Sequence, residues 1–169
     1  MDGSFTIDLA TRDDIPAIRA IEADPRYEGI VGRWSDAEHR EEMARPSSRY
    51  FVLRERDGGV AGFALLQGFG DSDLRIHLER IAAREPGAGL GSILLQGLLE
   101  RVYATTDVNR IDLDVFVGND RARRAYEKAG FRLEGVLRDY HRAGDGSFRD
   151  MWLMSVLRRD WERLRASRS

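Results

Sequence analysis

Three glycines between residues 86 and 91 have the spacing of a loop that binds a phosphate group. Gly87, Gly89 and Gly91 alternate with other residues, and glycine lets the backbone approach a ligand closely. The residues that follow predict a helix, whose first turn would offer unpaired N–H groups and the positive end of the helix dipole. Phosphate and pyrophosphate bind to such a helix start. A tight strand-to-helix turn also needs glycine, so the surrounding residues decide between a ligand and a turn.

Two widespread phosphate-binding motifs fit this loop poorly. A nucleoside triphosphatase loop ends in Gly-Lys-Ser/Thr, whereas Gly91 is followed by Ser92 and Ile93. A dinucleotide-binding loop needs its third glycine where Ser92 stands, although Asp112 or Asp114 lies at a suitable distance to hold a ribose. That fold also places its loop after the first strand, whereas four predicted strands precede this one. A dinucleotide-binding oxidoreductase therefore remains only as an alternative.

Hydrophobic periodicity predicts the elements that position this loop. Isoleucines at helical spacing predict a helix from Ile15 that ends at Pro25, and a capping-box pattern, Ser35-x-x-Glu38, predicts a second from about residue 35 to 44. Further helices are predicted from residue 90 through 102 and from 119 through 129, followed by a short amphipathic tail from Arg158. The seven predicted strands lie at about 5–9, 50–53, 60–66, 74–83, 110–116, 131–138 and 148–157. Seven strands with about four helices predict a mixed α/β sheet.

Length and composition are those of a soluble globular protein. The 169 residues predict one domain over residues 1–169, with 42% hydrophobic and 33% charged residues. The formal net charge of -2 gives no electrostatic attraction to nucleic acid or to an anionic membrane. No apolar stretch is long enough to span a bilayer and the first fourteen residues lack signal-peptide features, so we expect a cytoplasmic protein.

The absence of cysteine and the scarcity of histidine limit the chemistry. With no cysteine there can be no disulfide, no Cys-ligated metal and no acyl group held on a protein thiol. The three histidines, His39, His77 and His141, are widely spaced, so no metal site is predicted.

Two sequence blocks resemble the GNAT superfamily of acyl-CoA-dependent N-acetyltransferases, over about residues 74–131. Residues 80–95 are similar to the family's fourth strand, pyrophosphate loop and following helix. Residues 119–131 match its pattern Asn-x-x-Ala-x-x-x-Tyr-x-x-x-Gly-Phe. One departure is Pro86, which stands where the family usually has Arg or Gln three residues before the central glycine, Gly89. Arg84, two residues upstream, is the candidate to replace that side chain.

The resemblance implies a seven-stranded, mostly antiparallel mixed sheet, flanked by about four helices and splayed between strands 4 and 5. It also implies acetyl-CoA as co-substrate and no metal. The loop would bind the pyrophosphate through its backbone, the fourth strand would pair with the pantetheine arm, and Asn119 would contact the cofactor or cap its helix. The implied contacts are Gly87, Ala88, Gly89, Leu90, Gly91 and Ser92 in the loop, with Ile81 and Ala83 in the strand.

The resemblance further implies an acid and a base. Tyr126 occupies the position of the tyrosine that donates a proton to the departing CoA sulfur, although tyrosines on amphipathic helices are often core residues. Glu79 stands where many relatives carry the carboxylate that deprotonates the amine, and His77, on the same strand face, is the alternative. Tyr27, Trp34 and Tyr140 lie in segments that border the acceptor cleft in relatives.

The acceptor is predicted to be a primary amine: a protein N-terminal amine, a polyamine or another small amine, acetylated directly in a ternary complex. Sparse positions after Phe131 are similar to ribosomal-protein N-terminal and spermidine acetyltransferases. A polyamine would need several carboxylates in the cleft, and Glu28, Asp73 and Asp139 are candidates. Relatives commonly form homodimers. A noncatalytic CoA-binding regulatory module is the main alternative.

Overall fold

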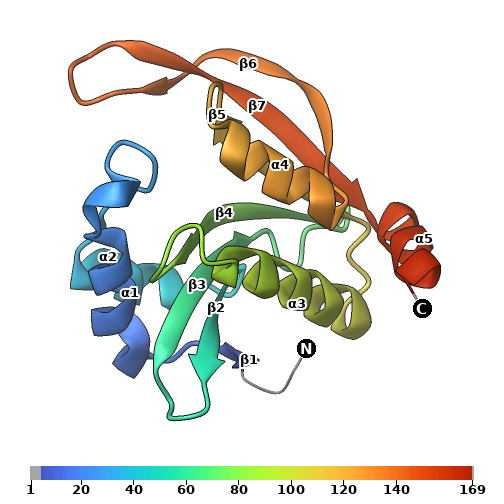
Figure 1. Ribbon diagram of the computed structural model, residues 1–169, viewed down its shortest axis with the longest axis horizontal. Helices are drawn as coiled ribbons and strands as arrows, with labels where there is room; N and C mark the ends of the chain where they lie inside the picture. The colour runs from blue at the N-terminus through green and yellow to red at the C-terminus, as the bar shows by residue number, and fades with distance from the viewer. Residues whose placement is uncertain (1–4, 169) are drawn as a thin grey trace.

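The computed structural model describes residues 5–168. Residues 1–4 and 169, the two ends of the predicted domain, lie outside the described residues. So do the first four of the fourteen residues that lack signal-peptide features. Seven strands form one sheet in the order β1-β2-β3-β4-β5-β7-β6 (Figure 1). The strands are β1 (Phe5–Leu9), β2 (Ser48–Glu55), β3 (Val60–Gln67), β4 (Arg75–Ala83), β5 (Arg110–Phe116), β6 (Arg132–Arg142) and β7 (Phe148–Leu157).

Within residues 5–168, five α-helices and two short 3₁₀ helices accompany these strands. The α-helices are α1 (Ile15–Glu22), α2 (Asp36–Met43), α3 (Leu90–Thr105), α4 (Asp120–Ala129) and α5 (Arg158–Arg168), and the 3₁₀ helices are η1 (Arg12–Asp14) and η2 (Pro25–Tyr27). The fifth α-helix is the predicted amphipathic tail. Ser35 caps α2 through the predicted capping box with Glu38. No helix within residues 5–168 is both long enough and apolar enough to cross a membrane.

Strand pairing confirms a mixed, mostly antiparallel sheet that separates between strands 4 and 5. Every neighbouring pair is antiparallel except β4 and β5. Those two strands pair in parallel only over Arg75–His77 and Arg110–Asp112. His77 and Asp112 therefore form the last rung before the strands diverge, and the two halves of the sheet open from that point.

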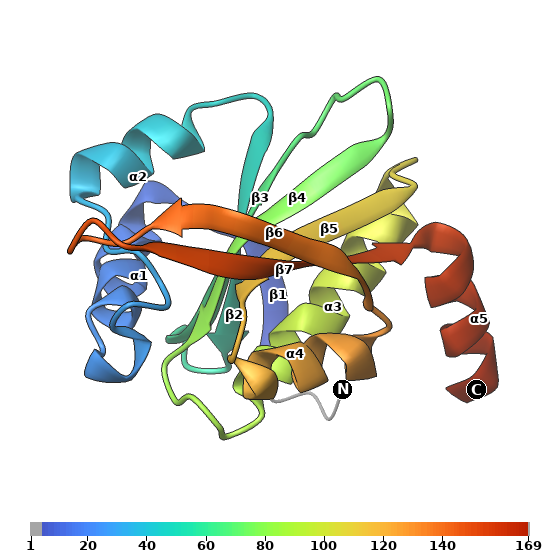
Figure 2. The ribbon, with the colours of Figure 1, turned by 90° about the horizontal axis from the view of Figure 1, so that it is seen from above.

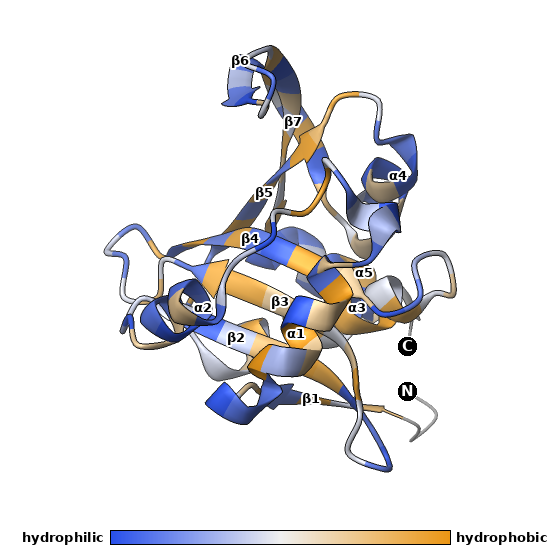
Figure 3. Cartoon of the chain, turned by 90° about the vertical axis from the view of Figure 1, so that its left-hand side faces the viewer, coloured by the Kyte–Doolittle hydropathy of each residue, from blue (hydrophilic) through white to orange (hydrophobic). Residues whose placement is uncertain are grey.

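Helices cover both faces of the first half of the sheet. Alternate residues of β2 and β3 point to opposite faces: Val52 and Phe63 pack toward α1, whereas Leu53 and Leu66 join the core under α3. A strand buried on both faces needs an apolar residue at almost every position, which explains the continuous apolar runs of these strands. Figure 3 shows the same division, with β3 largely hydrophobic and the surface helices α2 and α4 largely hydrophilic.

The β6–β7 hairpin extends past the rest of the second half toward the loop that follows η2 (Figures 1 and 2). The guanidinium of Arg149 in β7 donates a 2.8 Å hydrogen bond to the carbonyl of Gly29 in that loop. Strand β6 was predicted to end at Arg138 but continues to Arg142, because its register with β7 shifts between Leu137 and His141. Within the irregularity, Asp139 adopts a positive φ of 50°.

Candidate active site

The glycine loop between β4 and α3 has the backbone conformation that its sequence predicts. Gly87 and Gly89 have φ angles of 95° and 86°, values that side chains other than glycine rarely adopt. Gly89 is the N-cap of α3, so the amides of the first turn of this helix lie at the loop. Nothing lies within 4 Å of the positions that a Cβ would occupy at Gly89 and Gly91. The loop is therefore an open cradle at a helix start, which suits an anionic group.

An arginine from α4 lies beside this cradle. Arg84, the candidate to replace the missing loop side chain, instead forms a two-bonded ion pair with Glu55, with distances of 2.8 and 3.0 Å. The guanidinium of Arg121 lies 3.6 Å from the position of a Cβ on Gly87. Arg121 therefore adds positive charge beside the loop.

The edge of β4 beyond the last paired rung faces the space between the two halves of the sheet. The hydroxyl of Tyr27 lies 2.8 Å from both the amide nitrogen and the carbonyl oxygen of Ala83. Ile81, two residues earlier, directs its main-chain groups to the same side, because alternate residues of a strand do so. In this structure a strand-like ligand can therefore pair with Ile81 freely, whereas pairing with Ala83 requires Tyr27 to give up its hydrogen bonds.

Helix α4 carries Asn119 and Tyr126 to the opposite wall. The Asn119 side chain accepts a hydrogen bond from the amide of Ala122 at 3.3 Å and so caps the helix. Tyr126 is half-buried, and its ring centroid lies 5.7 Å from that of Phe131. Burial raises the pKa of Tyr126 to about 12. This phenol therefore stays protonated at neutral pH and is available as a proton donor.

One cleft of about 920 Å³ joins these features. It begins at the glycine loop and at Asn119, runs between Ile81 and Tyr126, and continues to a polar end formed by residues of β4, β5 and β6. The polar end is lined by His77, Glu79, Asp114 and Tyr140. The structure therefore brings every predicted catalytic residue and most of the predicted loop contacts to one connected space.

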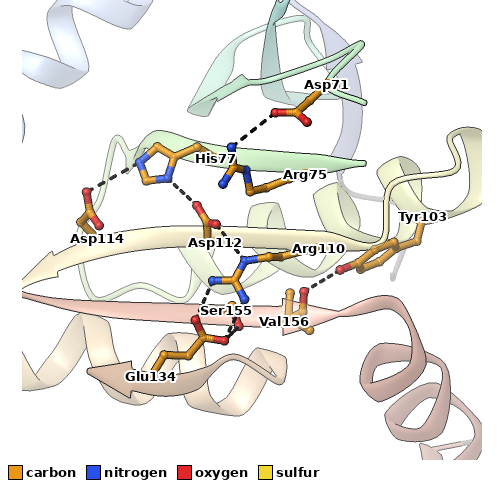
Figure 4. A network of polar contacts seen from close by, with 10 residues as sticks. All are labelled: Asp71, Arg75, His77, Tyr103, Arg110, Asp112, Asp114, Glu134, Ser155 and Val156. Carbon is orange, nitrogen blue, oxygen red and sulfur yellow. Dashed lines mark hydrogen bonds and ion pairs between the residues drawn. The ribbon is translucent and has the colours of Figure 1, made fainter. Parts of the chain in front are cut away.

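At the polar end, carboxylates surround His77 (Figure 4). Its Nδ1 lies 2.7 Å from Asp112 Oδ1, and its Nε2 lies 3.7 Å from Glu79 and 3.8 Å from Asp114. Burial alone would lower the pKa of His77, but the Asp112 hydrogen bond and the charges of Asp114 and Asp112 outweigh it and raise that pKa. Burial raises the pKa of Glu79 and that of Asp114. The end of the cleft is thus an anionic environment with groups that can exchange protons.

The carboxylates proposed from sequence for a cationic acceptor do not line the cleft. Glu28, Asp73 and Asp139 are absent from its walls, and the amide of Asp139 donates to Asp150 at the hairpin irregularity. Asp114 lines the cleft instead and Asp112 contacts His77 from behind, whereas the sequence had suggested these two residues only for holding a ribose. The available signal was their alternation with Ile111, Leu113 and Val115, which puts both aspartates on one face of β5.

The three aromatic residues predicted to border the acceptor cleft have different roles. Tyr27 lines the cleft but is buried and bonded to Ala83. The guanidinium of Arg80 stacks on the ring of Trp34, 3.8 Å from the ring centroid, and Trp34 is partly buried against the core cluster under α1. Tyr140 is exposed, and its hydroxyl interacts with the carboxylate of Asp114. Of the three, Tyr140 is therefore the one that presents its polar group at the acidic end.

Among the described residues, no group of three or more His, Cys, Asp or Glu side chains has the arrangement of a metal site. The acidic end instead pairs its groups with one another and with Arg110, whose Nε donates to Asp112 Oδ2 at 3.0 Å. The chemistry assembled here consists of an anion cradle, a protonated phenol and a carboxylate cluster with an imidazole.

Comparisons with known proteins agree with this geometry. The family model described as the acetyltransferase (GNAT) family matches residues 15–131. A Bacillus subtilis (strain 168) protein, provisionally named ribosomal protein bS18 alanine N-acetyltransferase, is 28% identical over 142 residues, which cover 83% of this chain and 89% of that protein. The spermine/spermidine N(1)-acetyltransferase of the same bacterium is 33% identical over 88 residues, which cover 48% of this chain and 58% of that protein.

The fold is also that of solved structures. The spermidine N-acetyltransferase of Vibrio cholerae, solved in complex with CoA and spermine, superposes with a TM-score of 0.83 at 20% identity, covering 95% of this chain and 99% of that one. At this identity the likeness establishes the fold alone. The arrangement of strands and helices over nearly the whole chain is thus a known architecture.

Proposed function

This chain belongs to the GNAT family of acetyltransferases, and on that premise we propose that it acetylates a small cationic primary amine, of the polyamine class, with Glu79 as the base and Tyr126 as the acid. The membership itself makes the chain an N-acetyltransferase that uses acetyl-CoA. The observation that carries the proposal is the single cleft that connects the glycine cradle with the acidic group around His77.

The residues present fit acetyl-CoA. The positive-φ glycines and the start of α3 form a cradle for its pyrophosphate, and Arg121 adds positive charge beside Gly87. The free edge at Ile81 suits its extended pantetheine arm, and Asn119 lines the same path. When bound, acetyl-CoA supplies a thioester that an amine can attack. We propose that residues 87–92 contact the pyrophosphate, as the sequence predicts. Ala83 could bind the pantetheine arm only after its hydrogen bonds with Tyr27 break.

Glu79 and Tyr126 would divide the proton transfers between them. Glu79 lies at the acidic end, where an ammonium group would be attracted, and its carboxylate would remove a proton to expose the amine lone pair. Tyr126 lies across the cleft on α4 and, with a pKa of about 12, would hold a proton for the sulfur that leaves. Most of the remaining catalysis would come from holding amine and thioester together in the right orientation.

The polarity of the acceptor end favours a cation. Glu79 and Asp114 line the cleft, with Asp112 directly behind His77. A primary ammonium beside these groups would gain charge-assisted hydrogen bonds, and a second ammonium on the same molecule would gain a further partner in Asp114. A protein N-terminus presents one ammonium group and would gain only the first of these partners, so we place a polyamine ahead of it.

Calorimetric titration tests the co-substrate and a coupled assay tests the acceptor. We expect one acetyl-CoA to bind per chain, with NADH as the control that should not bind. Thiol release should then be faster with spermidine or spermine than with peptides that begin with alanine, compared at equal concentration. Faster turnover of the peptides would assign the chain to protein N-terminal acetylation, and no turnover with any amine would favour the noncatalytic CoA-binding module.

Three further predictions stay part of this proposal. We expect residues 1–169 to act as one acetyltransferase domain, the protein to be cytoplasmic, and two copies to form a homodimer. Size-exclusion chromatography with light scattering measures the last directly.

A further inference from the structure

Acetylation of an ammonium group releases one proton. The balanced reaction is R–NH₃⁺ plus acetyl-CoA giving R–NH–CO–CH₃, CoA–SH and H⁺, in which the N–C bond forms and the C–S bond breaks. One proton from nitrogen ends on the sulfur, and the other must leave the site before the next turnover. The inference drawn from this balance rests on the proposed function, because it takes Glu79 as the group that first removes a proton.

His77 lies beside Glu79 at the acidic end of the cleft, in an orientation fixed by Asp112. Its Nδ1 is 2.7 Å from Asp112 Oδ1, so this nitrogen carries the hydrogen that donates to the carboxylate. The other nitrogen, Nε2, then has its lone pair free and lies 3.7 Å from a Glu79 oxygen. The Glu79 side chain is 37% exposed and that of His77 is 32% exposed, so a turn of the glutamate closes the gap and solvent reaches the imidazole.

Asp112 is itself held from behind by a chain of polar contacts (Figure 4). Its second oxygen accepts from Arg110 Nε at 3.0 Å. The two terminal nitrogens of Arg110 bind both oxygens of Glu134, at 2.8 and 2.6 Å, and Ser155 donates to the same glutamate at 2.6 Å. With its side chain only 12% exposed, Asp112 cannot turn away from His77 without breaking this chain.

The position in the sheet makes this orientation a consequence of the fold. His77 and Asp112 face each other on the last paired rung of β4 and β5. Glu79 and Asp114 are the next residues on the same faces, where the strands have begun to diverge. The pair therefore lies at the apex of the opening that forms the cleft, and its free nitrogen faces the carboxylates that line the walls.

The charges that face His77 favour a protonated imidazole. Glu79 comes from its own strand, Asp112 and Asp114 come from β5, and Tyr140 reaches Asp114 from β6. Its partner across β3 is the uncharged Gln67. On the cationic side, Arg110 is occupied by Asp112 and Glu134, and Arg75 pairs with Asp71 at 3.5 Å. Three nearby carboxylates thus support one positive charge on His77.

We propose that His77, oriented by Asp112, is the proton relay of this site. Its Nε2 takes from the Glu79 carboxyl group the proton that Glu79 removed from the acceptor ammonium. Glu79 is restored as a carboxylate, His77 becomes an imidazolium held by Asp112, and the proton then passes from Nε2 to solvent. Asp112 is a positioning residue that fixes the tautomer and stabilises the charged form.

The test compares His77→Asn, His77→Ala and Asp112→Asn with Asp71→Asn as the matched control. The asparagine amide at residue 77 can still donate to Asp112 where Nδ1 did, but it has no second nitrogen to accept a proton. Asp71 belongs to the same polar group in Figure 4 and does not contact His77. Turnover with spermidine is measured across the neutral and alkaline pH range, with melting temperatures to verify folding.

We expect His77→Asn to lower kcat by about 10- to 100-fold, with the acetyl-CoA KM unchanged. Asp112→Asn should lower kcat in the same direction and Asp71→Asn should not. His77 must be neutral to accept a proton, so wild-type activity should rise with pH through the raised pKa of His77, and this dependence should disappear in His77→Asn. Added imidazole should restore turnover in His77→Ala, which a purely structural role would not allow.

Two results would overturn the relay. One is a His77→Asn enzyme with wild-type kcat and pH profile. The other is a His77→Ala enzyme that imidazole does not rescue although it is folded. If in either case Glu79→Gln is inactive, the base role of Glu79 stands and only the relay is wrong. If Glu79→Gln turns over as fast as the wild type, Glu79 is not the base and this part of the proposed function is wrong. The relay then has no group from which His77 could receive the proton.

Discussion

At the scale of single residues, the site combines groups whose protonation is set by burial. Tyr126 keeps its proton because burial raises its pKa to about 12, and Glu79 holds a proton to higher pH than an ordinary glutamate because burial raises its pKa as well. The two groups come from α4 and β4 and line one cleft. A donor and an acceptor of protons on opposite walls are what a transfer from nitrogen to sulfur requires.

Replacement of Tyr126 by Phe removes only the hydroxyl. Since the ring stays against Phe131, we expect acetyl-CoA affinity and melting temperature to change little, while kcat falls by about 100-fold or more, the usual contribution of a general acid. Stopped-flow thiol release measures this rate. An unchanged kcat would show that Tyr126 is a packing residue, and the noncatalytic alternative would then gain weight if wild-type turnover is also absent.

Replacement of Glu79 by Gln removes the proposed base and keeps its size. Glu79 accepts a proton only when ionised, so wild-type kcat should increase as pH rises through the raised pKa of Glu79. We expect Glu79→Gln to be about 100-fold slower or more and to lose the part of the pH dependence that Glu79 causes. A matched variant, Glu100→Gln on the exposed side of α3, should behave as the wild type.

The sequence placed the proposed acid and base in the cleft but did not reveal the acidic environment around them. Tyr126 and Glu79 could be proposed because they occupy motif positions on elements with clear periodicity. Asp112 and Asp114 are distant from Glu79 in sequence, and only the parallel pairing of β4 with β5 brings them together. Glu28, Asp73 and Asp139 are equally acidic, and nothing in their local sequence shows that they lie outside the cleft.

At the scale of elements, local signals predicted most boundaries because each boundary has a local cause. Strand β5 and strand β7 begin and end where alternation begins and ends, and α2 begins after the capping box of Ser35. Two strands are longer than predicted: β2 covers Ser48–Glu55 instead of about 50–53, and β6 continues beyond Arg138 through the irregularity at Asp139. Such a shift depends on pairing with β7, which a single strand's sequence does not report.

The end of α3 depends on an arginine from α5. Arg158 donates hydrogen bonds to the carbonyls of Tyr103, Thr106 and Val108, with distances of 2.7, 2.5 and 3.0 Å. The carbonyls of Tyr103 and Thr106 belong to the last turn and the C-cap of the helix, where unpaired acceptors and the negative end of the dipole favour a cation. The first turn of the same helix forms the glycine cradle, so Arg158 stabilises the element on which the cradle is built.

Replacement of Arg158 by Met keeps the apolar stem and removes the donors. We expect a loss of about 2 kcal/mol in the free energy of unfolding, since hydrogen bonds from a charged group contribute about that much. The melting temperature should then fall by about 4–8 °C. Arg159→Met, at the exposed neighbouring position, should change stability by less than about 0.5 kcal/mol. Equal effects of the two variants would show that the helix end does not depend on Arg158.

At the scale of the whole molecule, the cleft exists because the sheet separates into two halves. Strands β1–β4 with α1 to α3 form one half, and β5–β7 with α4 form the other. Strands β4 and β5 join them over three rungs only. At the far end, the loop that follows η2 meets the β6–β7 hairpin, where Arg149 donates to the carbonyl of Gly29 (Figure 2). Ile30, Val31 and Gly32 in this loop line the cleft.

Arg149 therefore connects the two halves across the acceptor end. Its guanidinium also stacks on Phe116, 3.7 Å from the ring centroid, while Arg80 fixes the same loop from the other side through a 2.6 Å hydrogen bond to the carbonyl of Gly32. Arg149→Met should leave the Arg80 contact intact and free the loop at Gly29. If the variant loses the roughly 1 kcal/mol with which this hydrogen bond orders the loop, the KM for the acceptor amine should rise roughly fivefold.

The acetyl-CoA affinity of Arg149→Met should stay at the wild-type value, because the guanidinium contacts Gly29 and Phe116, which lie outside the glycine loop. Amide hydrogen exchange should become faster in residues 28–32 and remain unchanged in α3, and Arg138→Met, on the exposed part of β6, should show neither effect. If the acceptor KM and the exchange rates of residues 28–32 both keep their wild-type values, the hairpin does not order the loop, and the acceptor end is shaped by β4 and β5 alone.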